Sequence, residues 1–353
     1  MVSDYAAPKV SVVITCYNLG QYLDEAIASV LAQTFQDFEI VVVDDGSTDA
    51  ETQTAIAGCR KPKTRVIAAA HAGLPAARNL GIVNTSGTYL CALDADDRLE
   101  RSFLEKTVAA LDADPSATFA STWLRAFGEE IFEWKPERCD LPTLLWEDTV
   151  LTAALVRREA VAAVGGYDTA MPAQGDEDWD LWLTLVERGH RGVIVPEVLF
   201  EYRRRSGSMS SVCWYGPGHL PLAGYRIRKH DKAYQRHLVD VLLHQDAETA
   251  KLLQRNDALE REIASELDPA IALRGQELTL LRSRLGALSA DPQPTRAANG
   301  GAETESHDRI RDLETALTAT AAEVNALRTS LSWRVTAPLR YVYGWFLRQG
   351  NRE

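Results

Sequence analysis

The chain has 353 residues, of which 50 are Asp or Glu and 38 are Lys or Arg, giving a formal net charge of −12. This acidic balance argues against a nucleic-acid-binding protein, which needs a basic surface. No segment approaches the ~20 apolar residues of a transmembrane helix, and residues 1–30 lack the pattern of a signal peptide. The five cysteines are scattered and never spaced as C-x-x-C. They argue against a disulfide framework or a zinc site, and we expect a cytoplasmic protein.

The acidic surplus is unevenly distributed. Residues 1–220 contain 32 acidic and 19 basic side chains, a net charge of −13, so residues 221–353 carry +1. Much of the surplus gathers in three clusters, at 44–49, 94–97 and 176–180. Such clusters repel an anionic ligand unless a divalent cation lies between them, so they are compatible with a metal-bridged phosphate.

From Val10 onward, short β-branched runs alternate with stretches of helical periodicity. We expect strands at 10–15, 38–43, 65–69, 88–93 and 118–123, and helices at 21–33, 74–83 and 101–111. This alternation predicts an α/β fold, with a mostly parallel sheet covered by helices on both faces. In such sheets ligands bind beyond the carboxyl ends of the strands, which is where polar residues follow three of the expected strands.

The C-terminal part of the chain has a different character. Heptad-like apolar patterns occupy 271–288 and 310–331, separated by a stretch rich in Pro, Gly, Ala and Thr. We therefore divide the chain into an α/β domain at 1–225, a helical extension at 226–288, a flexible linker at 289–306 and a helix with a tail at 307–353. The heptads predict either a coiled coil that makes a homo-oligomer or two helices packed on the main domain.

Residues 331–353 interleave aromatic side chains with four arginines. This composition suits peripheral contact with an anionic membrane, here the inner face of the plasma membrane. The alternative is a helix that docks on a partner or on the α/β domain.

The segment Asp94-Ala95-Asp96 follows a buried strand. A D-x-D sequence is common in caps and solvated turns, but its place after a hydrophobic strand favours two carboxylates that bind a hard divalent cation. We expect the next residue, Asp97, to cap the following helix.

Two further acidic clusters stand at predicted element ends. Asp44 and Asp45 follow the second strand, where they could accept hydrogen bonds from a base or ribose or form a strand-to-helix turn. Asp176, Glu177, Asp178 and Asp180 open a predicted helix, where the helix dipole favours the ionised form. These acids exceed what capping needs, so an ionised carboxylate there could act as a general base, with flanking tryptophans stacking on sugar rings.

Taken together, these residues resemble glycosyltransferase family 2, the inverting nucleotide-sugar transferases of the GT-A fold. The resemblance covers about residues 8–215. It rests on several motifs in a fixed order: Val12–Asn18, Val42–Ser47, Gly73–Ile82, Leu93–Asp97, Gly165–Asp168, Glu177–Trp182 and Tyr202–Arg203.

The resemblance implies a role for each matching position. Thr15, Tyr17 and Asn18 line the nucleotide pocket, and Asp44 or Asp45 accepts from the base. Arg78 reaches the nucleotide or its phosphates, the Asp94–Ala95 segment contacts the ribose region, and Asp96 holds Mn²⁺ or Mg²⁺. Asp178 is the base that deprotonates the acceptor hydroxyl. The acceptor side is shaped by three neighbours, namely Glu177, Trp179 and Trp182.

One position departs from the family pattern. Members often have a histidine two residues after the Tyr202-Arg203 pair, and this chain has Arg205 there. A charged arginine does not ligate a metal, but it can clamp phosphate oxygens. Protein ligation of the metal then rests mainly on Asp96, with His219 as a candidate substitute ligand.

The resemblance implies transfer of a sugar from a nucleotide-diphosphate donor to a hydroxyl of a glycan or lipid-linked acceptor, by a single in-line displacement. The segment at 330–340 is similar to tails of bacterial transferases that build cell-surface polysaccharides. Two alternatives remain: a sugar nucleotidyltransferase, which would need a Gly-rich phosphate loop after the first strand, and a catalytically degenerate scaffold.

Overall fold

A computed structural model describes residues 7–205, 208, 219–262, 268–289, 311–323 and 326. The chain separates into two compact units, Met1–His244 and Gln245–Glu353. The first unit contains a sheet with the order β3-β2-β1-β4-β8-β6-β9-β5, and β7 pairs with β6 at the side of this path. The first unit ends at His244, beyond the domain boundary that we expected near residue 225.

The first half of the sheet is parallel. Its four strands are β1 (Val10–Cys16), β2 (Phe38–Asp44), β3 (Thr64–Ala68) and β4 (Tyr89–Asp94). β1 pairs in parallel with both β2 and β4, and every residue of β1 is buried. The β-branched run at 10–15 is what such a doubly covered strand requires. Because β1 and β4 are parallel neighbours, Thr15 lies beside Asp94 at their common carboxyl edge.

The second half of the sheet is mixed. It contains β5 (Arg98–Leu99), β6 (Ala117–Gly128), β7 (Phe132–Trp134), β8 (Leu155–Arg157) and β9 (Arg191–Arg204). β8 runs antiparallel to β4 and β6, and β9 runs parallel to β6 over their length. The parallel arrangement predicted from the sequence thus describes β1 to β4. The antiparallel strand that follows them, β8, is only three residues long, which is too short for an alternation of apolar and polar residues to be detected.

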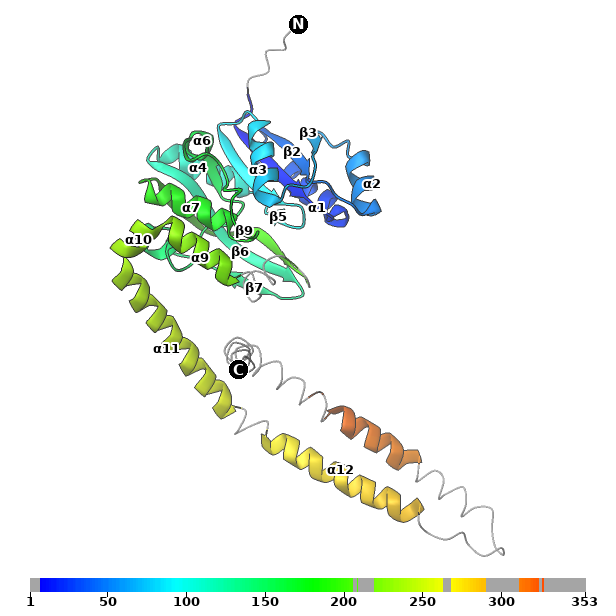
Figure 1. Ribbon diagram of the computed structural model, residues 1–353. Helices are drawn as coiled ribbons and strands as arrows, with labels where there is room; N and C mark the ends of the chain where they lie inside the picture. The colour runs from blue at the N-terminus through cyan, green and yellow to red at the C-terminus, as the bar shows by residue number, and fades with distance from the viewer. Residues whose placement is uncertain are drawn as a thin grey trace, which may run out of the picture. The chain divides into compact units, whose positions relative to one another are not determined.

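Helices cover both faces of this sheet (Figure 1). The main helices of the first unit are α1 (Gly20–Leu31), α2 (Ala50–Gly58), α3 (Leu74–Val83), α4 (Phe103–Ala113), α5 (Leu141–Leu144), α6 (Arg158–Val164), α7 (Glu177–Glu187), α9 (His219–Lys229) and α10 (Asp231–Arg236). α1 and α4 bury their apolar faces with Val12 and Ile14 of β1. α3 packs against Val13 on the opposite face, and a Cβ at Gly81 would lie only 2.2 Å from that side chain. Glycine therefore lets α3 approach the sheet closely.

The second unit contains helical structure. α11 (Leu238–Glu262) spans the boundary between the units, and α12 (Asp268–Ser289) holds the first predicted heptad stretch. Residues 311–323 are also helical, and Glu323 lies 3.1 Å from Arg274 of α12. Most of the predicted linker and the tail at 331–353 lie outside the described residues. In the part of the chain that the structure describes, no helix combines the length and apolarity needed to cross a membrane.

Candidate active site

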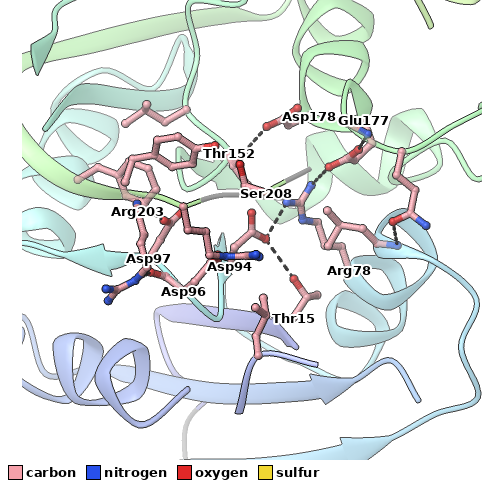
Figure 2. Close-up of a pocket in the computed structure, with 18 of the residues that line it drawn as sticks. Thr15, Arg78, Asp94, Asp96, Asp97, Thr152, Glu177, Asp178, Arg203 and Ser208 are labelled. Atoms are coloured by element: carbon pink, nitrogen blue, oxygen red, sulfur yellow. Dashed lines mark hydrogen bonds and ion pairs between the residues drawn. The ribbon is translucent and has the colours of Figure 1, made fainter. Parts of the chain in front are cut away.

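A cavity of about 600 Å³ opens beside the carboxyl ends of β1 and β4. Its walls also include residues of α3, the first turn of α7, and strands β6, β7 and β9. Figure 2 shows that segments far apart in the sequence turn their polar side chains toward this space. The cavity therefore lies where ligands bind in open α/β sheets.

Arg78 is the central cation of the site. It projects from α3, is only 1% exposed, and donates from Nη1 to Glu177 Oε1 (2.7 Å) and from Nη2 to Asp94 Oδ1 (2.9 Å). Burial disfavours the charge, yet Asp94 and Glu177 raise the pKa of Arg78 further above its ordinary value. Thr15 donates to the same oxygen of Asp94 over 3.2 Å (Figure 2). Arg78 thus links Glu177 at the start of α7 to Asp94 at the carboxyl end of β4.

Asp178 lies on the first turn of α7 and reaches the same cavity. The Thr152 hydroxyl donates a short hydrogen bond to Oδ2, and the Trp179 backbone N–H donates to Oδ1 over 2.9 Å. Burial raises the pKa of the Asp178 carboxyl, while Arg78 and the Thr152 hydrogen bond act in the opposite direction. A carboxylate with this raised pKa is a stronger proton acceptor than an exposed aspartate.

A second carboxyl group, Asp148, lines the cavity near Asp178. The Val150 N–H donates a long hydrogen bond of 3.4 Å to Oδ1 of Asp148. Burial, followed by the charge of Asp178, raises the pKa of Asp148 well above its usual range. The wall that carries Asp178 is therefore crowded with acidic groups.

Asp96 and Asp97 are held by the end of β9. Arg205 Nε donates to Asp96 Oδ2 over 2.8 Å, and burial together with Asp94 raises the pKa of Asp96. Asp97 is 2% exposed and accepts from the backbone N–H of Arg203 over 2.8 Å. The expectation that Asp97 caps the next helix is wrong, because α4 begins at Phe103 after Ser102 and the Asp97 carboxyl joins two strands instead.

Asp45 anchors the loop that leads into α3. Its carboxylate accepts from the backbone N–H groups of Ala72 (2.8 Å) and Gly73 (3.0 Å), and His71 Nδ1 lies 2.9 Å from Oδ2. The His71 ring stacks on Tyr17 with centroids 4.2 Å apart. Tyr17 is 41% exposed and lines the cavity, so this corner presents an accessible aromatic face.

Comparison with known proteins identifies the domain. The family described as "Glycosyl transferase family 2" matches residues 11–166. EpsE of Bacillus subtilis, named as a glycosyltransferase, is 29% identical over 212 residues that cover 57% of this chain and 75% of EpsE. The chain contains a glycosyltransferase family 2 domain at residues 11–166. It is accordingly a transferase, and its resemblance to this family is confirmed.

Two further relatives match this chain over 83% and 16% of their own length. TuaG of Bacillus subtilis, named for teichuronic acid biosynthesis, is 28% identical over 59% of this chain and 83% of TuaG. GlyA of Streptococcus pneumoniae is 37% identical, but the match covers only 30% of this chain and 16% of GlyA. The shared part is therefore the glycosyltransferase domain.

Solved structures show the same fold. The mannosyltransferase PcManGT of Pyrobaculum calidifontis, in complex with GDP-Man and Mn²⁺, superposes with a TM-score of 0.52 at 19% identity, over 90% of this chain and 87% of that one. TarS 1–349 of S. aureus, in complex with UDP-GlcNAc, gives 0.51 at 17% identity, over 95% and 92%. The GT-A fold predicted from the motifs is confirmed.

Nine of the site residues predicted from the sequence line the cavity: Thr15, Tyr17, Asp45, Arg78, Asp94, Asp96, Glu177, Asp178 and Arg205. Asn18 and Asp44 instead organise the neighbouring loop. Asn18 Oδ1 accepts from Thr48 N (2.8 Å), and Asp44 Oδ1 accepts from Ser47 N (3.0 Å). Ala95 is fully buried.

The two predicted acceptor tryptophans lie in the core. Trp182 is 0% exposed and packs on Phe119 with ring centroids 5.1 Å apart. Trp179 is 8% exposed and donates from Nε1 to the Leu144 carbonyl over 2.7 Å. Neither ring is among the residues that line the cavity, because both belong to the buried face of α7. Direct stacking of these rings on an acceptor sugar does not fit this geometry.

Sequence reasoning missed Asp148 and Thr152, which lie between the family motifs in an unpatterned segment. It also missed Arg203 as a positioning group, although the Tyr202-Arg203 pair was noted. Arg203 Nε donates to the Asp96 carbonyl over 2.8 Å. A pair of acidic residues, Glu147 and Asp148, between apolar residues was the one available signal for Asp148.

The carboxylate oxygens in the cavity are suitable ligands for a hard divalent cation. Asp94 and Asp96 place carboxylates in one cavity, and their side chains are 28% and 13% exposed. Arg78 contacts Oδ1 of Asp94, and Arg205 contacts Oδ2 of Asp96. The described residues contain no cluster of three or more His, Cys, Asp or Glu arranged around a metal. The two carboxylates of Asp94 and Asp96 match the ligands of Mg²⁺ or Mn²⁺ in phosphate sites, where one or two carboxylates bind the ion and phosphate and water complete its shell.

Proposed function

We propose that this protein is a metal-dependent, inverting glycosyltransferase. It moves a sugar from a nucleotide-diphosphate donor to a hydroxyl of a glycan or lipid-linked acceptor. One observation carries the proposal: the donor-side carboxylates Asp94 and Asp96 and the base candidate Asp178 line a single cavity. The solved structures with nucleotide-sugars support the donor class, since those proteins share the fold.

The chemistry assigned to the chain is a single displacement. Asp178 accepts the proton of the acceptor hydroxyl while that oxygen bonds to the anomeric carbon. The bond from this carbon to the diphosphate oxygen breaks, and its electron pair leaves with the nucleotide. Attack opposite the leaving group inverts the anomeric configuration. Thr152 and the Trp179 N–H orient the two oxygens of Asp178 during proton transfer.

Asp94 and Asp96 would hold the Mn²⁺ or Mg²⁺ ion, which supplies positive charge to the leaving diphosphate when bound. The Mn²⁺ present with GDP-Man in PcManGT supports this assignment. Arg205 stands beside Asp96, where its guanidinium can also bind a phosphate oxygen. Arg78 keeps Asp94 and Glu177 in place, because both carboxylates are paired with it.

The relatives' names suggest the biological setting. TuaG is named for teichuronic acid biosynthesis, so we assign the acceptor to cell-surface polysaccharide synthesis. The enzyme would act in the cytoplasm, with peripheral membrane contact through 331–353 and self-association through the heptad segments. Deletion of 331–353 should release the protein from liposomes of anionic lipid, and equal binding of both forms would contradict the membrane assignment.

The test of the activity is a donor screen. The full chain is incubated with UDP-, GDP- and dTDP-sugars and Mn²⁺, and nucleotide release is measured with and without EDTA. We expect metal-dependent hydrolysis of at least one donor, with the released sugar in the inverted configuration. Absence of release from every donor would favour the degenerate scaffold, and retention of configuration would exclude the single displacement.

A further inference from the structure

The strands β6, β7 and β9 present an aromatic surface to the cavity. Leu124 of β6 pairs with Trp134 of β7 and Phe200 of β9, and the next rung on the same face joins Phe132, Ala126 and Tyr202. Side chains two residues apart on a strand share a face, so the two rungs make one surface. All of these residues except Ala126 line the cavity.

The second rung joins two aromatic side chains through a small one. Ala126 is small and fully buried, and it separates Phe132 from Tyr202. Adjacent strands lie ~4.8 Å apart, so the two outer strands stand roughly 10 Å from each other across β6. Phe132 and Tyr202 both line the cavity, so their side chains are the part of this rung that a ligand can reach.

The exposure of these side chains points to a ligand. Phe132 is 44% exposed and Trp134 is half-buried, whereas the neighbouring Leu124 and Phe200 are buried in the core. The outer part of the surface is therefore accessible while its base is rigidly packed. Aromatic faces carry partial negative charge and attract the C–H groups of a sugar ring.

The charges in the same cavity select the kind of ligand. Asp148 and Asp178 supply carboxyl groups that can form hydrogen bonds with hydroxyls. The nearby Arg204 is already paired with Glu130 at 3.2 Å. An uncharged sugar ring can stack on the aromatic side chains and form hydrogen bonds with these carboxyl groups through its hydroxyls.

We propose that the face formed by Phe132, Trp134 and Tyr202 is the acceptor subsite, and that it binds the neutral pyranose ring whose hydroxyl is presented to Asp178. This rests on the proposed glycosyl transfer and replaces the buried Trp179 and Trp182 as the surface on which the sugar stacks. Stacking on C–H faces tolerates changes of hydroxyl configuration, so the subsite binds simple glycosides weakly.

The experiment measures binding of methyl hexopyranosides to the full chain by saturation-transfer NMR. The panel comprises the methyl glycosides of glucose, galactose, mannose and N-acetylglucosamine, each with and without UDP or GDP. We expect binding in the millimolar range for at least one glycoside. Phe132→Ala should weaken it about three- to ten-fold, the range expected for loss of one aromatic contact.

Ile131→Ala is the matched control, because Ile131 is adjacent, apolar and 82% exposed but does not line the cavity. Trp134→Ala is the second variant, with thermal denaturation as a check on folding since Trp134 also packs against the core. Equal binding by wild type and Phe132→Ala, or no binding of any glycoside to the wild type, would overturn the subsite.

Donor hydrolysis separates this inference from the proposed function. A wild type that binds glycosides but hydrolyses no donor contradicts the transferase activity and leaves the subsite standing. A wild type that hydrolyses donor while Phe132→Ala binds glycosides normally contradicts the subsite alone.

Discussion

Arg226 of α9 stacks on Trp179 of α7, with the guanidinium carbon 3.4 Å from the ring centroid. The same guanidinium forms a short ion pair with Asp176, the residue that precedes α7, and Arg226 is only 5% exposed. Asp178 lies between these two contacts in the sequence. A helix that follows the family match at 11–166 thus holds the turn that carries the base candidate.

Arg226→Ala should lower both stability and turnover. Its removal leaves Asp176 buried without its cation, which costs about 3 kcal/mol in comparable pairs. Arg226→Lys keeps the charge but loses the planar stacking, so an intermediate effect is expected. Thermal denaturation and donor hydrolysis measure the two effects. Arg228→Ala is the control, because Arg228 is exposed on the same helix; equal behaviour of the two alanine variants would refute the positioning role.

Asp178→Asn tests the base directly. The amide cannot accept the acceptor proton, so kcat for transfer should fall by roughly 10²- to 10⁴-fold. Donor affinity should stay within a factor of two, because Asp96 and Arg205 remain in place. Calorimetric titration with the nucleotide diphosphate and steady-state kinetics give the two quantities. Normal turnover in this variant would exclude Asp178 as the base.

Asp96 and Arg205 make separable contributions to donor binding. Asp96→Ala should remove the gain in nucleotide-diphosphate affinity that Mn²⁺ produces, since it deletes a proposed ligand. Arg205→Gln should weaken binding both with and without Mn²⁺, because it deletes a cation that reaches phosphate directly. Calorimetry with Mn²⁺ or EDTA distinguishes these outcomes. An unchanged Mn²⁺ effect in Asp96→Ala would contradict the ligand assignment.

The pH dependence of turnover should report on Asp178. Its pKa is raised by burial, so activity should fall as the pH drops through that raised value and the carboxylate becomes protonated. Thr152 donates a hydrogen bond that favours the ionised form. Thr152→Val should therefore move the acidic limb of the kcat profile to higher pH. An unmoved acidic limb would show that another group controls it.

The sequence was most informative where local pattern decides structure. Residues 74–83 were predicted as a helix and form α3 over those residues, because Gly73 and Pro75 mark its start and its apolar face has a helical period. The motif also indicated Arg78. Its contact with Glu177, 99 residues away, depends on how α7 packs, which no local pattern encodes.

The acceptor side was harder for the same reason. Trp179 and Trp182 sit beside the acidic turn in the sequence, which favoured a role in the site. Helical periodicity turns both rings away from the cavity and into the core. The aromatic surface of β6, β7 and β9 arises from strand pairing between distant segments, so only the register reveals it.

Asp148→Asn should stabilise the folded protein near neutral pH. The pKa of Asp148 is raised well above its usual value by burial and by Asp178, so the folded state holds this proton more tightly than the unfolded state. Stability then decreases as pH rises from the unfolded pKa to the folded one, and ionisation at pH 8 works against folding. The asparagine removes this term, so its melting temperature should exceed that of the wild type at pH 8. The difference should shrink toward pH 4.5, where the wild-type carboxyl keeps its proton.

Asp114→Asn is the control of opposite sign, because Ser116 and Arg191 lower the pKa of Asp114 to about 2 and its ionised form favours folding. A lower melting temperature for Asp148→Asn at pH 8 would show that the Asp148 carboxylate is stabilised by its surroundings.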